Sequence, residues 1–152
     1  MLTLDDYFKG QKPTLPEHID NATELLRRMN LLVTKFYADH PGAASLSFRE
    51  LASGYRTEAV NAVTAGAAAH SKHMSGQAGD LGDGMGARAY RRWLVINEPL
   101  LKQIGLWVED PRATPTWGHT QCVPPASQAR YFIPNSAWAT RVGGKPLSVD
   151  DI

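Results

Sequence analysis

The chain has 152 residues, 43% apolar and 20% charged, which is the size and composition of one globular domain and excludes a disordered chain. Its formal net charge of +1 argues against a nucleic-acid partner, because such a partner is bound by a strongly basic surface. The single cysteine, Cys122, excludes an internal disulfide framework and a cysteine-based structural zinc.

The N-terminal residues are predicted to be irregular up to position 20, because Pro13 and Pro16 would interrupt a helix. Asn21 then has the pattern of a helix N-cap, with Glu24 as its capping-box partner. Apolar residues recur at helical spacing after it, which predicts an amphipathic helix over 22–38.

The rest of the chain alternates between short strand patterns and helical patterns. In chain order we expect a strand region over 45–55, a short helix over 57–62, a strand over 78–82, two helices within 86–104, and strands over 106–109, 116–123 and 130–134. The two helices should meet near Asn97, because Pro99 suits the first turn of a new helix. Residues 135–152 should form a loosely held tail. This order predicts one α+β domain over 1–152 with an antiparallel sheet.

No apolar run of about 18 residues occurs, so we expect no membrane insertion. The stretch MLTLDDYFKG is acidic and lacks the apolar segment of a signal peptide. We therefore expect a monomeric protein that is cytoplasmic when synthesised and that needs another agent to deliver it if it acts outside the cytoplasm.

The stretch SKHMSGQAGD contains the most informative polar residues. It places His73 and Asp80 seven positions apart, and Gly76 and Gly79 between them allow a sharp turn. His119 lies in a second strand pattern, on the same face as Trp117 and Gln121. Two imidazoles and one carboxylate form a common ligand set for catalytic zinc, which leaves a fourth position for water. The spacing alone is equally compatible with a polar loop and an unrelated strand histidine.

Three motifs in order along the chain add to this pattern. They are SGYRTEAVN at 53–61, the block Ser71-x-His73-x6-Asp80, and Trp117-Gly118-His119. Together they resemble the M15 family of zinc peptidases, which comprises D-Ala-D-Ala carboxypeptidases and related peptidoglycan endopeptidases, including phage endolysins. The resemblance covers roughly residues 20–123. It implies one Zn²⁺ ion held by His73, Asp80 and His119 on an antiparallel sheet.

The resemblance also implies roles for residues around the ion. Arg56, from the SGYR motif, would contact substrate and stabilise negative charge on the attacked carbonyl oxygen, because a guanidinium is always charged. Ser71 would fix the loop or a ligand beside the substrate, and Asn61 would bond the loop backbone. Trp117 shares the His119 face and is a candidate wall of the substrate groove. A core position is the alternative for this tryptophan.

One position departs from the family pattern. The family usually has an acidic general base three residues before the last histidine, and here that position is Thr116. We expect Glu109 to replace it, because a turn after Glu109 would return the chain antiparallel beside the strand of His119. Asp110 and Asp83 are the alternatives, and a site without a base is the remaining one.

Other candidate side chains are assigned to packing. Cys122 lies three residues from His119, on the opposite face of a regular strand, so we expect a buried, inert thiol rather than a fourth ligand. Trp107 and Phe132 are assigned to the core.

The sequence supports three functional hypotheses. The first is a zinc peptidase, of host or phage origin, that cleaves peptidoglycan stem or cross-link peptides. The second is a non-catalytic, zinc-stabilised binding domain on the same fold, which the threonine at 116 would suit. The third is a cytoplasmic dipeptidase that acts on free D-Ala-D-Ala.

Overall fold

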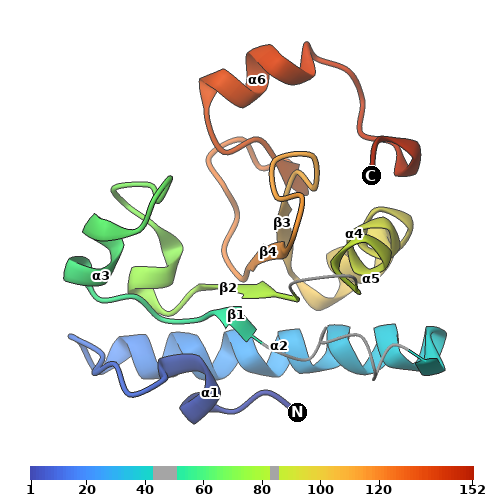
Figure 1. The fold of residues 1–152 in the computed structure, drawn as a ribbon. Helices are drawn as coiled ribbons and strands as arrows, with labels where there is room; N and C mark the ends of the chain where they lie inside the picture. The colour runs from blue at the N-terminus through green and yellow to red at the C-terminus, as the bar shows by residue number, and fades with distance from the viewer. Residues whose placement is uncertain (43–50, 83–85) are drawn as a thin grey trace.

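The computed structural model describes residues 1–42, 51–82 and 86–152, which form helices and one sheet, as an α+β chain (Figure 1). The helices are α1 (Leu4–Phe8), α2 (Glu17–Asp39), α3 (Glu58–Val63), α4 (Gly86–Ile96), α5 (Glu98–Ile104) and α6 (Ser136–Val142), with 3-10 turns η2 (Lys72–Ser75) and η3 (Val149–Asp151). The strands are β1 (Leu51–Ser53), β2 (Ala78–Leu81), β3 (Trp107–Glu109), β4 (Gly118–Gln121) and β5 (Tyr131–Phe132).

The five strands make one sheet in the order β1-β2-β4-β3-β5. The pairs β1–β2, β2–β4 and β3–β4 are antiparallel, as predicted, whereas β5 joins β3 in parallel. Two strands that are distant in sequence, β2 and β4, therefore lie side by side at the centre of the sheet. The side chains that each of them carries on one face are brought together by this pairing.

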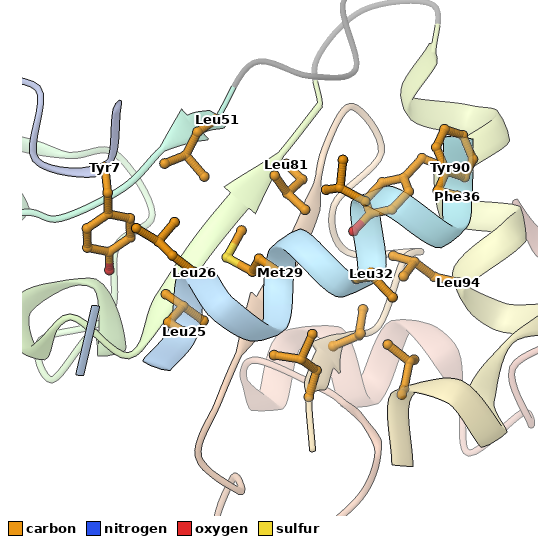
Figure 2. Close-up of a cluster of buried hydrophobic side chains, with 14 of the residues drawn as sticks. Tyr7, Leu25, Leu26, Met29, Leu32, Phe36, Leu51, Leu81, Tyr90 and Leu94 are labelled. Atoms are coloured by element: carbon orange, nitrogen blue, oxygen red, sulfur yellow. The ribbon is translucent and has the colours of Figure 1, made fainter. Parts of the chain in front are cut away.

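The core lies between α2 and the other face of the sheet. Figure 2 shows apolar side chains of α2 packed against Leu51 of β1, Leu81 of β2 and residues of α4. The fully buried residues of α2 recur at three- and four-residue steps: Ala22, Leu25, Met29, Leu32 and Phe36. Each of the large ones contributes about 1.5–3 kcal/mol by leaving water.

Helix α2, the long helix beneath β1 and β2 in Figure 1, has 23 residues, yet its outer face is polar. Across residues 1–42, 51–82 and 86–152, no helix combines the length and the apolar character that crossing a bilayer requires.

The N-terminal prediction is wrong in two respects. Residues 4–8 form α1, capped by a reciprocal pair of hydrogen bonds between Thr3 and Asp6, and α2 begins at Glu17 rather than at 22. Pro16 opens α2 instead of preventing it, because a proline is tolerated at a helix start, where its missing N–H is not needed. Asn21 therefore lies inside the helix, and its Nδ2 donates to the carbonyl of Ser75 in η2 at 2.9 Å.

Most of the later elements are confirmed. The helix expected over 57–62 is α3, and the break expected near Asn97 separates α4 from α5. The strands expected over 78–82, 106–109, 116–123 and 130–134 are present in shortened form. Part of the strand region expected over 45–55 lies outside the described residues, and β1 is the part that the structure describes.

The C-terminal segment is tied to the fold more firmly than the expected loose tail. Arg88 Nε donates to the Ile152 carbonyl and Arg92 Nη1 to the Val149 carbonyl, each at 2.8 Å. Both arginines come from α4, so α4 anchors η3. Helix α6 buries no side chain, and in Figure 1 it stands on the far side of the sheet from α2.

A prediction concerns Gly54, which follows β1. A Cβ at this position would lie 2.1 Å from the Tyr7 carbonyl oxygen, which also accepts a hydrogen bond from Tyr55 N. We expect Gly54→Ala to lower the free energy of unfolding by about 2–3 kcal/mol, because backbone must move to make room. Urea unfolding measures this change. Gly42→Ala is the control, since a Cβ there meets no atom within 4 Å among the residues that the structure describes. Equal stability of the two variants would contradict the prediction.

Candidate metal centre

One row of residues crosses the sheet from edge to edge and supplies most of the site. Ser53 on β1 pairs with Asp80 on β2, and Asp80 pairs with His119 on β4. Continuing the β3–β4 register places Glu109 opposite His119, and Glu109 pairs with Phe132 on β5. Directly paired residues point to the same face of a sheet. All five side chains accordingly line one pocket, on the face away from α2.

His73 reaches this row from η2, the turn just before β2. Ser71 caps the turn, and its Oγ accepts from His73 N at 3.4 Å. Gly76 ends the turn with φ 74°, and a Cβ there would lie 2.4 Å from the His18 carbonyl oxygen, so glycine allows the turn to pack against α2. The Nδ1 atom of His73 donates to the Gly54 carbonyl at 2.6 Å, which leaves Nε2 as an acceptor facing the row.

Three side-chain atoms converge at the centre of the site and could hold a metal ion: His73 Nε2, Asp80 Oδ1 and His119 Nδ1. The histidine atoms lie 3.3 Å apart, and Asp80 Oδ1 lies 2.8 Å from His119 Nδ1 and 3.4 Å from His73 Nε2. A tetrahedral zinc with bonds of about 2.0–2.1 Å separates its ligand atoms by about 3.3–3.4 Å. The two separations that involve His73 Nε2 therefore already fit a tetrahedral zinc, and the separation between Asp80 Oδ1 and His119 Nδ1 would have to increase by about 0.5 Å.

Hydrogen bonds outside this triangle fix its orientation. Arg56 Nη2 donates to Asp80 Oδ2 at 3.2 Å, which leaves Oδ1 toward the histidines. Arg56 Nε in turn donates to Ser53 Oγ at 3.0 Å. Outer partners of this kind normally orient metal ligands. The SGYR motif thus supplies the carbonyl that holds His73, through Gly54, and the guanidinium that holds Asp80.

Burial and mutual contacts shift the pKa values of the three groups, downward for Asp80 and His73 and upward for His119. For Asp80, burial raises the pKa, but hydrogen bonds from His119 and His73 outweigh it and hold the pKa below its usual range. For His119, burial lowers the pKa, but the hydrogen bond and charge of Asp80 outweigh it, and the pKa is raised. Burial dominates for His73 and lowers its pKa. At neutral pH, Asp80 is therefore ionised and His73 neutral, the forms that bind metals.

Glu109 lies in the row beside His119, as the sequence predicted from the turn between their strands. Burial raises the pKa of its carboxyl group; the charge of His119 opposes this rise, and Asp80 and Asp110 add to it. A carboxylate with a raised pKa is a better proton acceptor at neutral pH than an exposed one. The position and the environment of Glu109 both suit a general base.

The alternatives to Glu109 differ in position. Asp110 is 3% exposed and pairs with Arg112 at 2.7 Å, and it is not among the residues that line the pocket. Thr116, where the family pattern has its acid, is exposed and also outside the pocket lining. Asp83 lies outside the described residues.

The pocket above the row has a volume of about 740 Å³. Trp117 and Gln121 line it with His119, as the alternation of side chains along this strand predicts. Arg56 and Ser71 line it as well. Every residue that the sequence assigned to catalysis, metal binding or substrate contact is therefore found at this one pocket.

Two residues assigned to the core have other surroundings. Phe132 is half-buried at the pocket and meets His119 edge to face, with ring centroids 6.0 Å apart. Trp107 is half-buried, and the Arg130 guanidinium lies 4.4 Å from its ring centroid. Trp107 pairs with Gln121 and Phe132 pairs with Glu109, so both side chains stand on the pocket face of the sheet and not on the face that packs against α2. Cys122 packs half-buried against the core, and burial raises its pKa, as expected of an inert thiol.

The sequence analysis assigned no role to three residues that shape the site. Ser53 holds Arg56, Gly54 holds His73, and Gln121 lines the pocket. The signal for Gln121 was present in the strand alternation that placed His119. Nothing in one sequence reveals the β1–β2 register that brings Ser53 beside Asp80. Asn61 behaves as predicted, since its Nδ2 donates to the Ala68 carbonyl at 2.9 Å.

Comparison of the chain with protein-family models, with curated proteins and with solved structures finds no significant match in any of the three. The interpretation of the site consequently depends on its own geometry and on the sequence motifs.

A first prediction for the site concerns metal content. At zinc concentrations about 100 times the dissociation constant, binding stabilises a fold by about 2.7 kcal/mol, which corresponds to a rise in Tm of roughly 5–10 °C for a chain of this size. We expect wild type to show this rise with one ion bound per chain, and His119→Ala to show neither. Thermal melts and elemental analysis measure the two effects. His40→Ala, at the end of α2, is the control and should show the same zinc-dependent rise in Tm and the same zinc content as wild type.

A second prediction concerns pH. Because the pKa of His119 is raised, the metal-free protein keeps a proton there to higher pH, and an ion must displace it. The pKa of His73 is lowered, so its ring is already neutral in that range. Zinc affinity should therefore fall about tenfold per pH unit as pH drops through the His119 pKa, since one proton is released. Competition with a chelator from pH 5.5 to 8 measures the slope. A hundredfold fall per unit would contradict the assignment.

Proposed function

We propose that this chain is a zinc-dependent peptidase that hydrolyses stem or cross-link peptides of peptidoglycan. The observation that carries the proposal is the convergence of His73, Asp80 and His119 beside Glu109 in one pocket. The substrate class comes from the motif resemblance to M15 peptidases. The residues themselves support metal-dependent hydrolysis.

Zinc is the ion that best fits the donor set. Two imidazole nitrogens and one carboxylate oxygen at near-tetrahedral separations suit Zn²⁺, whereas Mg²⁺ and Ca²⁺ prefer six or more oxygen ligands. The ion, when bound, supplies Lewis-acid chemistry: it lowers the pKa of water to roughly 7 and polarises a carbonyl group.

Glu109 would move the proton. Its carboxylate accepts a proton from the attacking water and returns it to the leaving amine, so one residue acts first as base and then as acid. Its burial supports this role, because a raised pKa brings the carboxylate closer to neutral pH. Its place on a strand, next to the strand that carries His119, gives it a fixed distance from the reaction centre.

Arg56 would hold the ligand Asp80 and contact the substrate at the same time. Its Nη2 holds Asp80 and its Nε holds Ser53, while no partner for Nη1 is found among residues 1–42, 51–82 and 86–152. The guanidinium lines the pocket, so Nη1 is available to the carbonyl oxygen of a bound peptide. A permanent positive charge at this place stabilises the negative charge that develops during attack.

The presence of Glu109 favours an enzyme over a binding domain that only uses zinc for stability. The argument for the binding domain was the threonine at 116, and a carboxylate from the neighbouring strand supplies what that position lacks. The dipeptidase hypothesis uses the same site chemistry and differs only in substrate.

One assay separates the three hypotheses. Zinc-loaded protein is incubated with purified cell walls and with free D-Ala-D-Ala, with and without a chelator, and the products are identified by mass spectrometry. We expect chelator-sensitive release of peptides from the walls, and the product masses identify the bond that is cut. Cleavage of the dipeptide alone would indicate the dipeptidase. Cleavage of neither substrate would contradict both enzyme proposals and leave the binding domain.

The role of Glu109 gives a further prediction. Glu109→Gln should lower the turnover number by about 10²–10⁴-fold, because it removes the proton acceptor, while zinc content and Tm stay near wild type. Asp110→Asn is the matched comparison: it should lower stability through loss of the Arg112 ion pair but retain the turnover number of the folded enzyme. Wild-type turnover in Glu109→Gln would refute the assignment.

A further inference from the structure

The pocket has two side walls of different chemical character. One, the 64–72 wall, consists of lining residues 64–68 and 70–72, and it carries His70 and Lys72 among small side chains. The other, the 125–134 wall, consists of lining residues 125–127 and 132–134, and it carries no ionisable side chain. The candidate metal ligands line the same pocket, so a substrate that spans it meets both a segment that carries a cation and a neutral, largely apolar one.

Lys72 is the lysine among the described residues that line the pocket; Lys12, which likewise has no hydrogen bond or ion pair within the described ranges, lies outside that lining. The Lys72 side chain is exposed, and within the described ranges its ammonium group makes no hydrogen bond or ion pair. By contrast, Lys35, Lys102 and Lys145 each pair with a carboxylate. An unpaired ammonium group at the rim of a pocket is free to bind an anionic group of a ligand.

The charges inside the pocket favour the same kind of ligand. Among the lining residues that the structure describes, the carboxylates are Asp80 and Glu109, and both belong to the row on the floor. Arg56 and Lys72 balance these two charges, so a bound divalent ion gives this set of described lining residues a net positive charge. Electrostatic complementarity of this kind selects partners of opposite charge.

We propose that Lys72 determines specificity by binding a free carboxylate of the substrate peptide at the 64–72 wall, while the uncharged part of the peptide lies against the 125–134 wall. This inference rests on the proposed peptidase function and deepens it, because it names the chemical feature that a good substrate must have. Peptides whose carboxyl groups are amidated would be poorer substrates than the same peptides in acid form.

The size of the effect follows from the exposure of Lys72. An ion pair at an exposed position changes affinity by about two- to fivefold, and salt screens it. The effect should appear in KM and leave kcat unchanged, because Lys72 lies on the wall and not in the row that performs the chemistry. A structural role for Lys72 would instead change zinc content or Tm.

The test compares two forms of one substrate. Zinc-loaded protein is given a synthetic peptidoglycan stem pentapeptide with free carboxyl groups and the same peptide with all carboxyl groups amidated. We expect wild type to show a two- to fivefold lower KM for the acid form at low salt, and no difference at 0.5 M salt. Lys72→Ala should lose the preference, and Lys72→Glu should reverse it. Lys102→Ala, which changes an exposed lysine outside the pocket lining, should match wild type.

The outcomes distinguish this inference from the proposed function. If wild type cleaves both peptides with equal KM, or if Lys72→Ala keeps the preference, the inference is overturned and the peptidase function stands. If wild type cleaves neither peptide, calorimetric titration of the same peptides tests the inference about Lys72 separately. Tighter binding of the acid form that depends on Lys72 would support the inference without catalysis, and equal or absent binding of the two forms would overturn it.

Discussion

The register of the five-stranded sheet is the constraint on which the site depends. Asp80, His119 and Glu109 come from three separate strands, and they meet because each stands opposite the next in the hydrogen-bonded ladder. Shifting any of these strands by one residue would turn its contribution to the opposite face, toward the helices. The apolar contacts between α2 and the sheet hold that register, since the same slip would also bring polar side chains into the core.

Two of the candidate ligands stand on strands of the sheet, and the third stands on a short turn. Asp80 and His119 are fixed by the central strand pair, whereas His73 is supplied by a 3-10 turn that depends on a serine cap and on a glycine with positive φ. The bond from Asn21 to this turn ties it to α2, so the long helix supports the sheet and the turn together. The residue pattern S-x-H-x6-D thus encodes a cap, a ligand, a turn and a strand start within ten residues.

Much of this arrangement is local and could be predicted from one sequence. The periodicity of α2, the break at Asn97 and the alternation around His119 are short-range signals, and the structure confirms them. The start of α2 differs from the expectation, because Pro16 stands at the opening of the helix and does not interrupt it. Contacts such as that of Ser53 with Arg56 depend on which strands become neighbours, and a single sequence contains no direct signal of that pairing.

The position of Glu109 has a consequence for the loop between β3 and β4. The candidate ligands and the proposed proton acceptor stand on β2, β3, β4 and η2, so residues 110–117 supply none of them, and the pair of Asp110 with Arg112 maintains the shape of this loop. Such a loop can change in length or composition while the proposed reaction centre stays in place. Trp117 at its end would then move relative to a fixed centre, so this scaffold can acquire new substrate preferences by altering one loop.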